Sequence, residues 1–159
     1  MRRVFIGLMM TAVLGSRASA QVDSIAPLLA TADPAAGESY AKKVCAQCHS
    51  LNEGGKAIIG PNLYGVVGGP HAHMADFKYS DALKTKQGAW TYDNLFAWLT
   101  KPDAYAQGTL MAFPGIKNEK LRLDVIAYLR TLSHNPAPLP TPETQTPDVA
   151  QAATTRRGP

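Results

Sequence analysis

The chain has 159 residues, of which 45% are apolar, so it is long enough for one domain with a packed core but leaves little room for two. Its 16 Lys and Arg exceed its 12 Asp and Glu, yet they form no clustered run or stripe, which argues against a nucleic-acid-binding protein. No apolar run reaches the roughly eighteen residues that a membrane-spanning helix needs.

The first twenty residues have the layout of a secretory signal peptide. Arg2 and Arg3 give a positive start, residues 4–15 are apolar, and residues 18–20 form a small-residue cleavage site. We expect cleavage before Gln21 and export to the periplasm, because the alternative, an uncleaved membrane anchor, requires a longer apolar stretch. Without the signal peptide, 13 Lys and Arg face 12 acidic residues, so the expected mature chain has a formal net charge of +1.

The next region combines a predicted helix with a long loop. Residues 21–34 are interpreted as an N-terminal lead, at the end of which Asp33 can cap a helix and Pro34 suits its first turn. That helix is predicted over residues 35–46. Residues 50–75 are rich in glycine and predict a loop that is long for a small domain unless it packs on a large prosthetic group.

Two helices are predicted in the middle of the chain. Ser80 is expected to cap a short one that ends at Lys84. Thr91 is expected to cap a second, which Pro102 terminates and a loop over residues 103–117 follows. The apolar positions of this second helix have the spacing i, i+3, i+4, i+7 that is typical of a helix, namely Tyr92, Leu95, Phe96 and Leu99.

A final helix and a tail complete the predicted all-α fold. Asn118 can cap the last helix, whose apolar face comprises Leu121, Val125, Tyr128, Leu129 and Leu132. The domain is therefore placed at residues 35–133. Residues 134–159 are rich in proline, threonine and alanine and are expected to form an extended or disordered tail. No segment shows a convincing alternating strand pattern.

The strongest chemical signal is the segment C-A-Q-C-H at positions 45–49. This C-x-x-C-H arrangement is the attachment signature of haem c. The thiols of Cys45 and Cys48 can add to the two vinyl groups of one porphyrin, and His49 then lies beneath the iron as a ligand. The alternatives are a thioredoxin-like redox pair, which usually follows a strand, a structural disulfide, and a zinc site, for which ligands at finger spacing are lacking.

A second signal lies in the turn-rich segment G-T-L-M-A-F-P-G at positions 108–115. Met111 could be an ordinary core residue. However, haem iron that has histidine on one face commonly has methionine on the other in electron carriers. A neutral thioether favours ferrous iron, and it keeps the iron six-coordinate in both oxidation states.

Together these motifs resemble the class I c-type cytochromes, the soluble electron carriers of bacteria and mitochondria. The resemblance runs from about residue 35 to residue 132, and its segments are C-A-Q-C-H at 45–49, G-P-N-L at 60–63, Trp90, G-T-L-M-A-F-P-G-I at 108–116 and I-A-Y-L at 126–129. It implies the class I cytochrome c fold, in which three main helices, short helices and loops wrap around one haem.

The resemblance also implies roles for individual residues. Met111 matches the sixth iron ligand, and the carbonyl of Pro61 matches the acceptor of the His49 imidazole proton. Tyr79 and Trp90 match groups that bind the cofactor by hydrogen bonds to a buried propionate, although ordinary core packing would also explain them. A further match is Gly37, where the first helix would cross the last one near Tyr128 and Leu129.

Three positions depart from the mitochondrial pattern. Gly69 stands where an arginine commonly pairs with a propionate, Trp98 where a tyrosine often bonds the methionine sulfur, and Leu110 where a lysine is common. Compensation of the propionate charge is expected from His71, His73 or solvent, although histidines in such a polar loop are usually solvated. A ligand role for these histidines or for Met74 is disfavoured because Met111 fits better.

These inferences predict a periplasmic, single-haem electron carrier that is not an enzyme. It would act as a monomer and pass single electrons from a respiratory membrane complex or a dehydrogenase to an oxidase or a reductase. One alternative is a haem c subunit of a stable dehydrogenase complex, in which the tail would be a tether. Another is a peroxidase or gas-binding haem protein, which would need an open iron site.

Overall fold

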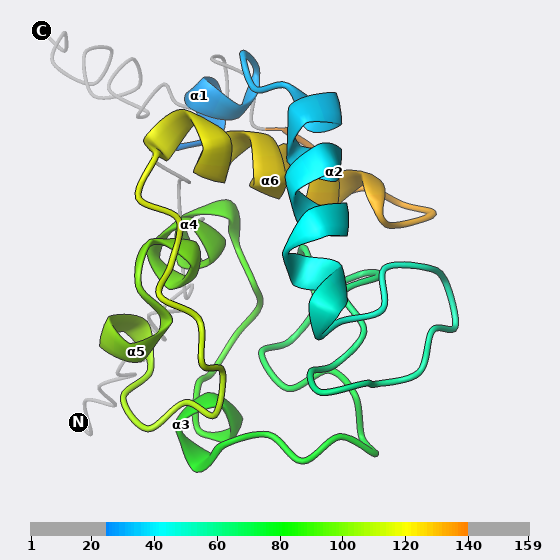
Figure 1. The fold of residues 1–159 in the computed structure, drawn as a ribbon, viewed down its shortest axis with the longest axis vertical. Helices are drawn as coiled ribbons and strands as arrows, with labels where there is room; N and C mark the ends of the chain where they lie inside the picture. The colour runs from blue at the N-terminus through cyan, green and yellow to red at the C-terminus, as the bar shows by residue number, and fades with distance from the viewer. Residues whose placement is uncertain (1–24, 140–159) are drawn as a thin grey trace, which may run out of the picture.

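Three helices form the framework of the computed structural model, which describes residues 25–139 (Figure 1). They are α2 (Pro34–Lys43), α4 (Tyr92–Thr100) and α6 (Glu119–Thr131), and the shorter elements are α1 (Ala26–Leu29), the 3₁₀ helix η1 (Cys45–Gln47), α3 (Asp81–Lys84) and α5 (Pro102–Tyr105). Within the described part of the chain no strand forms, and one isolated bridge joins Pro70 and Ala89. The all-α prediction is therefore confirmed.

Helix α2 begins as the sequence predicts but ends earlier. The Asp33 carboxylate accepts hydrogen bonds from the backbone N–H groups of Ala35 and Ala36, at 2.9 and 3.2 Å, and so caps the helix. The prediction of a helix through residue 46 is wrong, because α2 ends at Lys43 and the chain tightens into η1. This tight turn contains most of the cysteine motif.

Polar caps also begin the other two main helices. The Thr91 hydroxyl accepts from the backbone N–H of Asn94 at 3.1 Å, and the Asn118 side chain accepts from that of Leu121 at 2.9 Å. Both predicted caps are confirmed. Ser80 does precede α3, but its hydroxyl makes no capping hydrogen bond, so that part of the prediction is wrong.

Two short helices were not expected from the sequence. Pro102 does follow the end of α4, but it also begins α5, because proline is well suited to the first turn of a helix. Within the predicted lead, Ile25 precedes α1, Leu29 ends it, and both are buried in the core. The lead is thus part of the packed domain from residue 25 onward.

The crossing of α2 over α6 forms the centre of the packing (Figure 1). Gly37 lies directly on the backbone of Asp124 and Val125, so a Cβ at position 37 would overlap the Asp124 carbonyl group. The predicted contact exists, but it lies about one turn earlier than the expected Tyr128 and Leu129. The Asp124 carboxylate also accepts a hydrogen bond from the backbone N–H of Asp33 at 2.7 Å, which ties the start of α2 to α6.

Helix α4 packs mainly as the apolar spacing predicts. Tyr92, Leu95 and Leu99 are buried, in agreement with the prediction. Phe96 is only partly buried, and the Arg122 guanidinium lies 4.1 Å from its ring centroid. The buried position on this helix that the prediction missed is Trp98.

The chain remains in contact with the domain after α6. The Ala137 carbonyl accepts hydrogen bonds from the Tyr92 hydroxyl at 2.8 Å and from Nε of Arg130 at 2.6 Å. The first residues of the predicted tail are therefore packed. The predicted signal peptide, residues 1–20, and the rest of the predicted tail lie outside the described residues.

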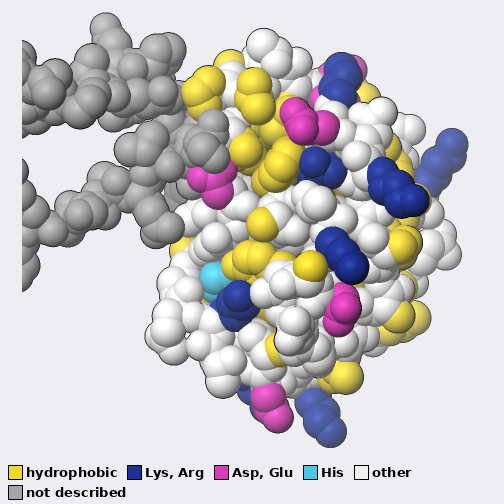
Figure 2. Space-filling model, turned by 90° about the vertical axis from the view of Figure 1, so that its left-hand side faces the viewer, with side chains coloured by type: hydrophobic (Ala, Val, Ile, Leu, Met, Phe, Trp, Pro, Cys, Tyr) yellow, Lys and Arg dark blue, Asp and Glu magenta, His cyan; other side chains and the backbone are white. Residues whose placement is uncertain are grey.

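The surface carries charges of both signs. Basic side chains are spread over the face shown in Figure 2, with acidic and apolar side chains between them. No helix within residues 25–139 has both the length and the apolar character required to cross a membrane.

We predict that Gly37→Ala destabilises the fold. The added methyl group meets backbone atoms of α6, which cannot rotate away, so the two helices must separate. Overpacking of this kind costs about 1–3 kcal/mol of unfolding free energy. Denaturant unfolding would measure this loss, with Ser39→Ala at an exposed position of the same helix as the control, whose expected change is within about 0.5 kcal/mol. Equal stability of the two variants would contradict the prediction.

Candidate functional site

A cavity of about 480 Å³ lies between α6, α4 and the loops that connect the helices. Most of its wall is apolar and comes from residues far apart in the sequence, among them Leu63, Val66, Leu83, Leu95, Leu99, Val125 and Leu129. The structure also brings to this wall every site residue that the sequence predicted, namely Cys45, Cys48, His49, Pro61, Tyr79, Trp90 and Met111.

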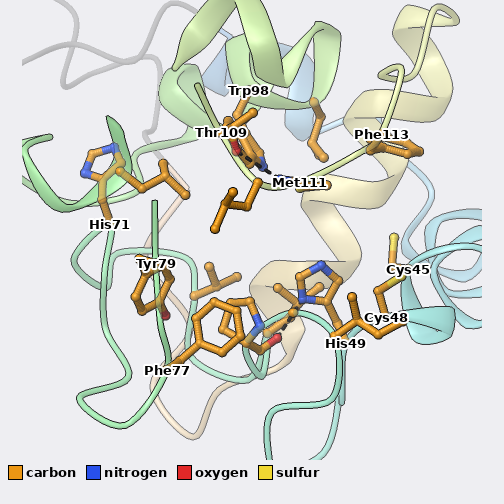
Figure 3. A pocket seen from close by; sticks show the side chains of 18 of the residues that line it. Cys45, Cys48, His49, His71, Phe77, Tyr79, Trp98, Thr109, Met111 and Phe113 are labelled. Atoms are coloured by element: carbon orange, nitrogen blue, oxygen red, sulfur yellow. Dashed lines mark hydrogen bonds between the residues drawn. The ribbon is translucent and has the colours of Figure 1, made fainter. Parts of the chain in front are cut away.

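The cysteine motif forms one end of the cavity (Figure 3). The backbone N–H groups of Cys48 and His49 both donate to the carbonyl of Cys45, at 3.0 and 2.9 Å, and this tight turn places the three side chains on the same wall. Cys45 and Cys48 are free thiols. Burial raises the pKa of the Cys45 thiol to about 11, so this thiol is protonated at neutral pH.

His49 is held in a fixed orientation by one hydrogen bond. Its Nδ1 lies 2.6 Å from the carbonyl oxygen of Pro61, as the resemblance implied. Because a carbonyl can only accept, Nδ1 carries the proton and Nε2 keeps a lone pair. Burial lowers the pKa of His49, which favours this neutral form. At Gly60 a Cβ would lie 2.7 Å from Nδ1, so glycine is needed for the ring to sit there.

Met111 lies across the cavity from His49 (Figure 3). The Thr109 hydroxyl accepts a hydrogen bond from the backbone N–H of Met111 at 3.2 Å, which holds the methionine in a tight turn. Trp98 lines the same part of the wall. The structure thus places an imidazole and a thioether on opposite sides of one apolar space.

The other two predicted residues close the cavity at the end away from the cysteines. The Tyr79 hydroxyl accepts from the backbone N–H of Met74 at 3.3 Å and lies 3.4 Å from Nδ1 of His73. Burial raises the pKa of Tyr79, so its hydroxyl keeps its proton. Trp90 is buried, and its backbone N–H donates to the Gly69 carbonyl at 2.8 Å.

Two further polar residues lie on the wall. His71, which the sequence analysis named as one source of compensation for the propionate charge but placed in a loop that is usually solvated, is only 3% exposed. Ser80 was expected to cap a helix, yet its buried Oγ has no hydrogen-bond partner among the described residues. Met74, in contrast, does not line the cavity, and its sulfur accepts a hydrogen bond from the backbone N–H of Asn62 at 3.1 Å.

The residues present fit a haem. The apolar wall suits a flat porphyrin ring, the two free thiols suit its vinyl groups, and the Nε2 lone pair of His49 suits its iron. The unpartnered hydroxyl of Ser80 and the hydroxyl of Tyr79 can donate to the propionate groups. The zinc alternative has less support, since no cluster of three metal-binding side chains exists within the residues that the structure places.

Comparison with known proteins gives one consistent family. A model of the cytochrome c family matches residues 34–133. A cytochrome c homolog of Bradyrhizobium diazoefficiens is 44% identical over 128 residues, which are 80% of this chain and 69% of that protein.

Two other relatives agree. A cytochrome c homolog of Rickettsia conorii is 46% identical over 112 residues, 70% of this chain and 63% of that protein, so the chain spans slightly less than two thirds of this relative. Cytochrome c of Theileria annulata is 45% identical over 101 residues, 64% of this chain and 87% of that protein. With the family match covering more than half of its length, this chain belongs to the cytochrome c family and carries covalently bound haem c.

Proposed function

We propose that this chain is a periplasmic, single-haem electron carrier that shuttles single electrons between a respiratory or dehydrogenase donor and an oxidase or reductase. In this proposal it is not an enzyme, and it acts as a monomer that docks only briefly with each partner. The observation that carries the proposal is the placement of His49 and Met111 on opposite sides of the cavity that Cys45 and Cys48 also line.

The bound haem supplies an iron that changes between the ferric and ferrous states. His49, through Nε2, and Met111, through its thioether, would hold this iron, because both residues line the cavity. The hydrogen bond from His49 to Pro61 fixes the imidazole, and the hydrogen bond from the Met111 backbone N–H to the Thr109 hydroxyl fixes the chain at the methionine. With both residues positioned in this way, little would need to move on electron transfer, and no position on the iron would remain open for a substrate.

The periplasmic location rests on the predicted signal peptide, residues 1–20, and on the thioether chemistry of Cys45 and Cys48. A cofactor joined to the chain by two covalent bonds cannot dissociate into the surrounding medium, which suits an exported protein. The covalent bonds also leave the non-covalent contacts of the cavity free to set the reduction potential.

Two strongly exposed apolar side chains line the cavity, and the exposed Lys78 lines it as well. Ile59 and Leu110 both line the cavity, and they are 73% and 71% exposed. We define the rim by these two residues and propose that partners dock there, where the cofactor would lie closest to the surface. Because the rim lacks the lysine common before the methionine, docking depends less on charge steering and more on apolar contact.

We predict that Met111→Ala lowers the reduction potential of the haem-loaded protein. Loss of the neutral thioether removes its preference for ferrous iron, and a decrease of roughly 0.1 V or more is expected, since axial ligands span about 0.8 V in haem proteins. Spectroelectrochemical titration measures this change, and carbon monoxide should bind rapidly to the reduced variant but not to the reduced wild type.

Met74→Ala is the matched control for that variant, because the Met74 sulfur is engaged by the Asn62 backbone and does not line the cavity. Its potential should stay close to the wild-type value. If Met111→Ala retained both the wild-type potential and the thioether–iron absorption band, Met111 would be removed from the ligand assignment.

We also predict that Leu110→Lys introduces charge steering at the rim. Oxidation of the reduced protein by ferricyanide, a small anion, should become several-fold faster at low ionic strength, and the gain should fade as salt is added. Leu28→Lys adds the same charge on α1, where Leu28 is 45% exposed and does not line the cavity, and it should have a smaller effect. Equal effects in stopped-flow measurements of the two variants would argue against docking at the rim.

A further inference from the structure

His71 is buried and lines the cavity wall, and the proposed function does not assign it a role. Its Nδ1 lies 3.1 Å from the carbonyl oxygen of Gly88, and its Nε2 lies 2.8 Å from the Tyr105 hydroxyl. Its ring packs on the buried Trp90, with 4.3 Å between the ring centroids. Figure 3 shows its position at the end of the cavity opposite the cysteines.

The two hydrogen-bond partners of His71 differ in what they allow. The Gly88 carbonyl can only accept, so Nδ1 always carries a proton. The Tyr105 hydroxyl can donate or accept, so it donates to Nε2 of the neutral ring and accepts from Nε2–H of the cationic ring. Both protonation states of His71 are therefore satisfied without movement of the ring.

The surroundings of His71 favour its neutral form in the absence of another charge. Burial lowers the pKa of His71, the hydrogen bond to Gly88 raises it and Lys86 lowers it. The titratable groups that face His71 are Tyr105 on α5, whose own pKa burial raises, and Lys86, whose Nζ lies 4.1 Å from the centroid of the Tyr105 ring. The neutral form therefore dominates at pH 7, and the cation forms only at lower pH.

His71 also lies close to the position of the missing arginine. The Gly69 carbonyl accepts from the backbone of Trp90, and the ring of Trp90 packs on His71. An arginine at position 69 would carry a permanent positive charge. This chain instead has His71 close to that position, and His71 is positive only when it is protonated.

We propose that His71 binds a proton at Nε2 when the haem is reduced and releases it when the haem is oxidised, so that electron transfer is coupled to proton transfer. This inference rests on the proposed electron-carrier function. The redox partner supplies the electron and the solvent supplies the proton. One added electron removes one positive charge from the cavity, which makes the cationic form of His71 more favourable, and by linkage the cationic form favours reduction.

The sign of the pH dependence follows from this coupling. The pKa of His71 is higher in the reduced protein than in the oxidised one, and the reduction potential rises as the pH falls through the interval between these two values. That interval lies mainly below 6.5, the ordinary value for histidine, because burial lowers the pKa. A tenfold difference in proton affinity between the two states corresponds to about 59 mV for one electron.

The test is a series of potential measurements on the full-length, haem-loaded protein between pH 4 and pH 8. The wild type should show a flat potential above pH 7 and a rise below it, while His71→Gln, which cannot become charged, should show a rise at least threefold smaller. His134→Gln is the matched control, since His134 is exposed and paired with Glu53 at 2.6 Å, and it should retain the wild-type profile. An undiminished rise in His71→Gln would assign the effect to the propionates or to His73, which also lines the cavity, and overturn the proposal, and a flat wild-type profile would overturn it too.

A second measurement needs no variant and covers the case in which His71→Gln does not fold. Proton NMR of the His71 ring in the oxidised and reduced wild type should show titration at higher pH in the reduced state. Identical titration in both states, or no titration in either, would overturn the proposal. Failure of the electron-carrier function itself is distinguishable, because the protein would then show no reversible one-electron potential at any pH.

Discussion

The contact between Gly37 and the backbone of α6 determines where the cysteine motif can lie. Because no side chain intervenes, α2 rests directly on Asp124 and Val125, and the Asp124 carboxylate holds the N–H of Asp33 at the start of the same helix. Only one residue separates the end of α2 from the start of η1. The orientation of α2 therefore determines the orientation of the turn that carries the two thiols and His49. The position of the haem site is thus set by a helix crossing, and Val125 takes part both in this crossing and in the cavity wall.

Predictions from the sequence succeeded where structure depends on neighbouring residues. The caps at Asp33, Thr91 and Asn118 are local, since each side chain bonds to N–H groups two or three residues further along. The single-turn helices α1 and α5 have no periodicity to detect and were missed, whereas the equally short α3 was expected after Ser80. Trp98 is buried and Phe96 only partly so because of how α4 is rotated about its axis against its neighbours. The spacing of the apolar residues predicts a helix but does not fix this rotation.

The same contrast between local sequence and distant packing explains which site residues the sequence identified. Residues in short motifs, such as His49 and Met111, were identified because their chemistry depends on identity and spacing along the chain. His71 and Ser80 lie in segments that look polar and exposed, and only the wrapping of the loop over the cavity buries them. A sequence pattern cannot distinguish a polar side chain that faces solvent from one that faces a cofactor. The fold buries both on the same wall as Tyr79, so this part of the wall has more polar groups than the motifs alone indicated.

The carbonyl of Ala137, which receives hydrogen bonds from Tyr92 and Arg130, shows that the domain does not finish where its last helix does. A fusion or a purification tag joined directly after Ser133 would remove this acceptor and with it the hydrogen bonds from Tyr92 and Arg130. Joining a foreign sequence beyond Leu139 preserves both bonds. For this protein, the natural place to attach an electrode linker or a fluorescent label is therefore several residues downstream of the position that the helix boundary alone would indicate.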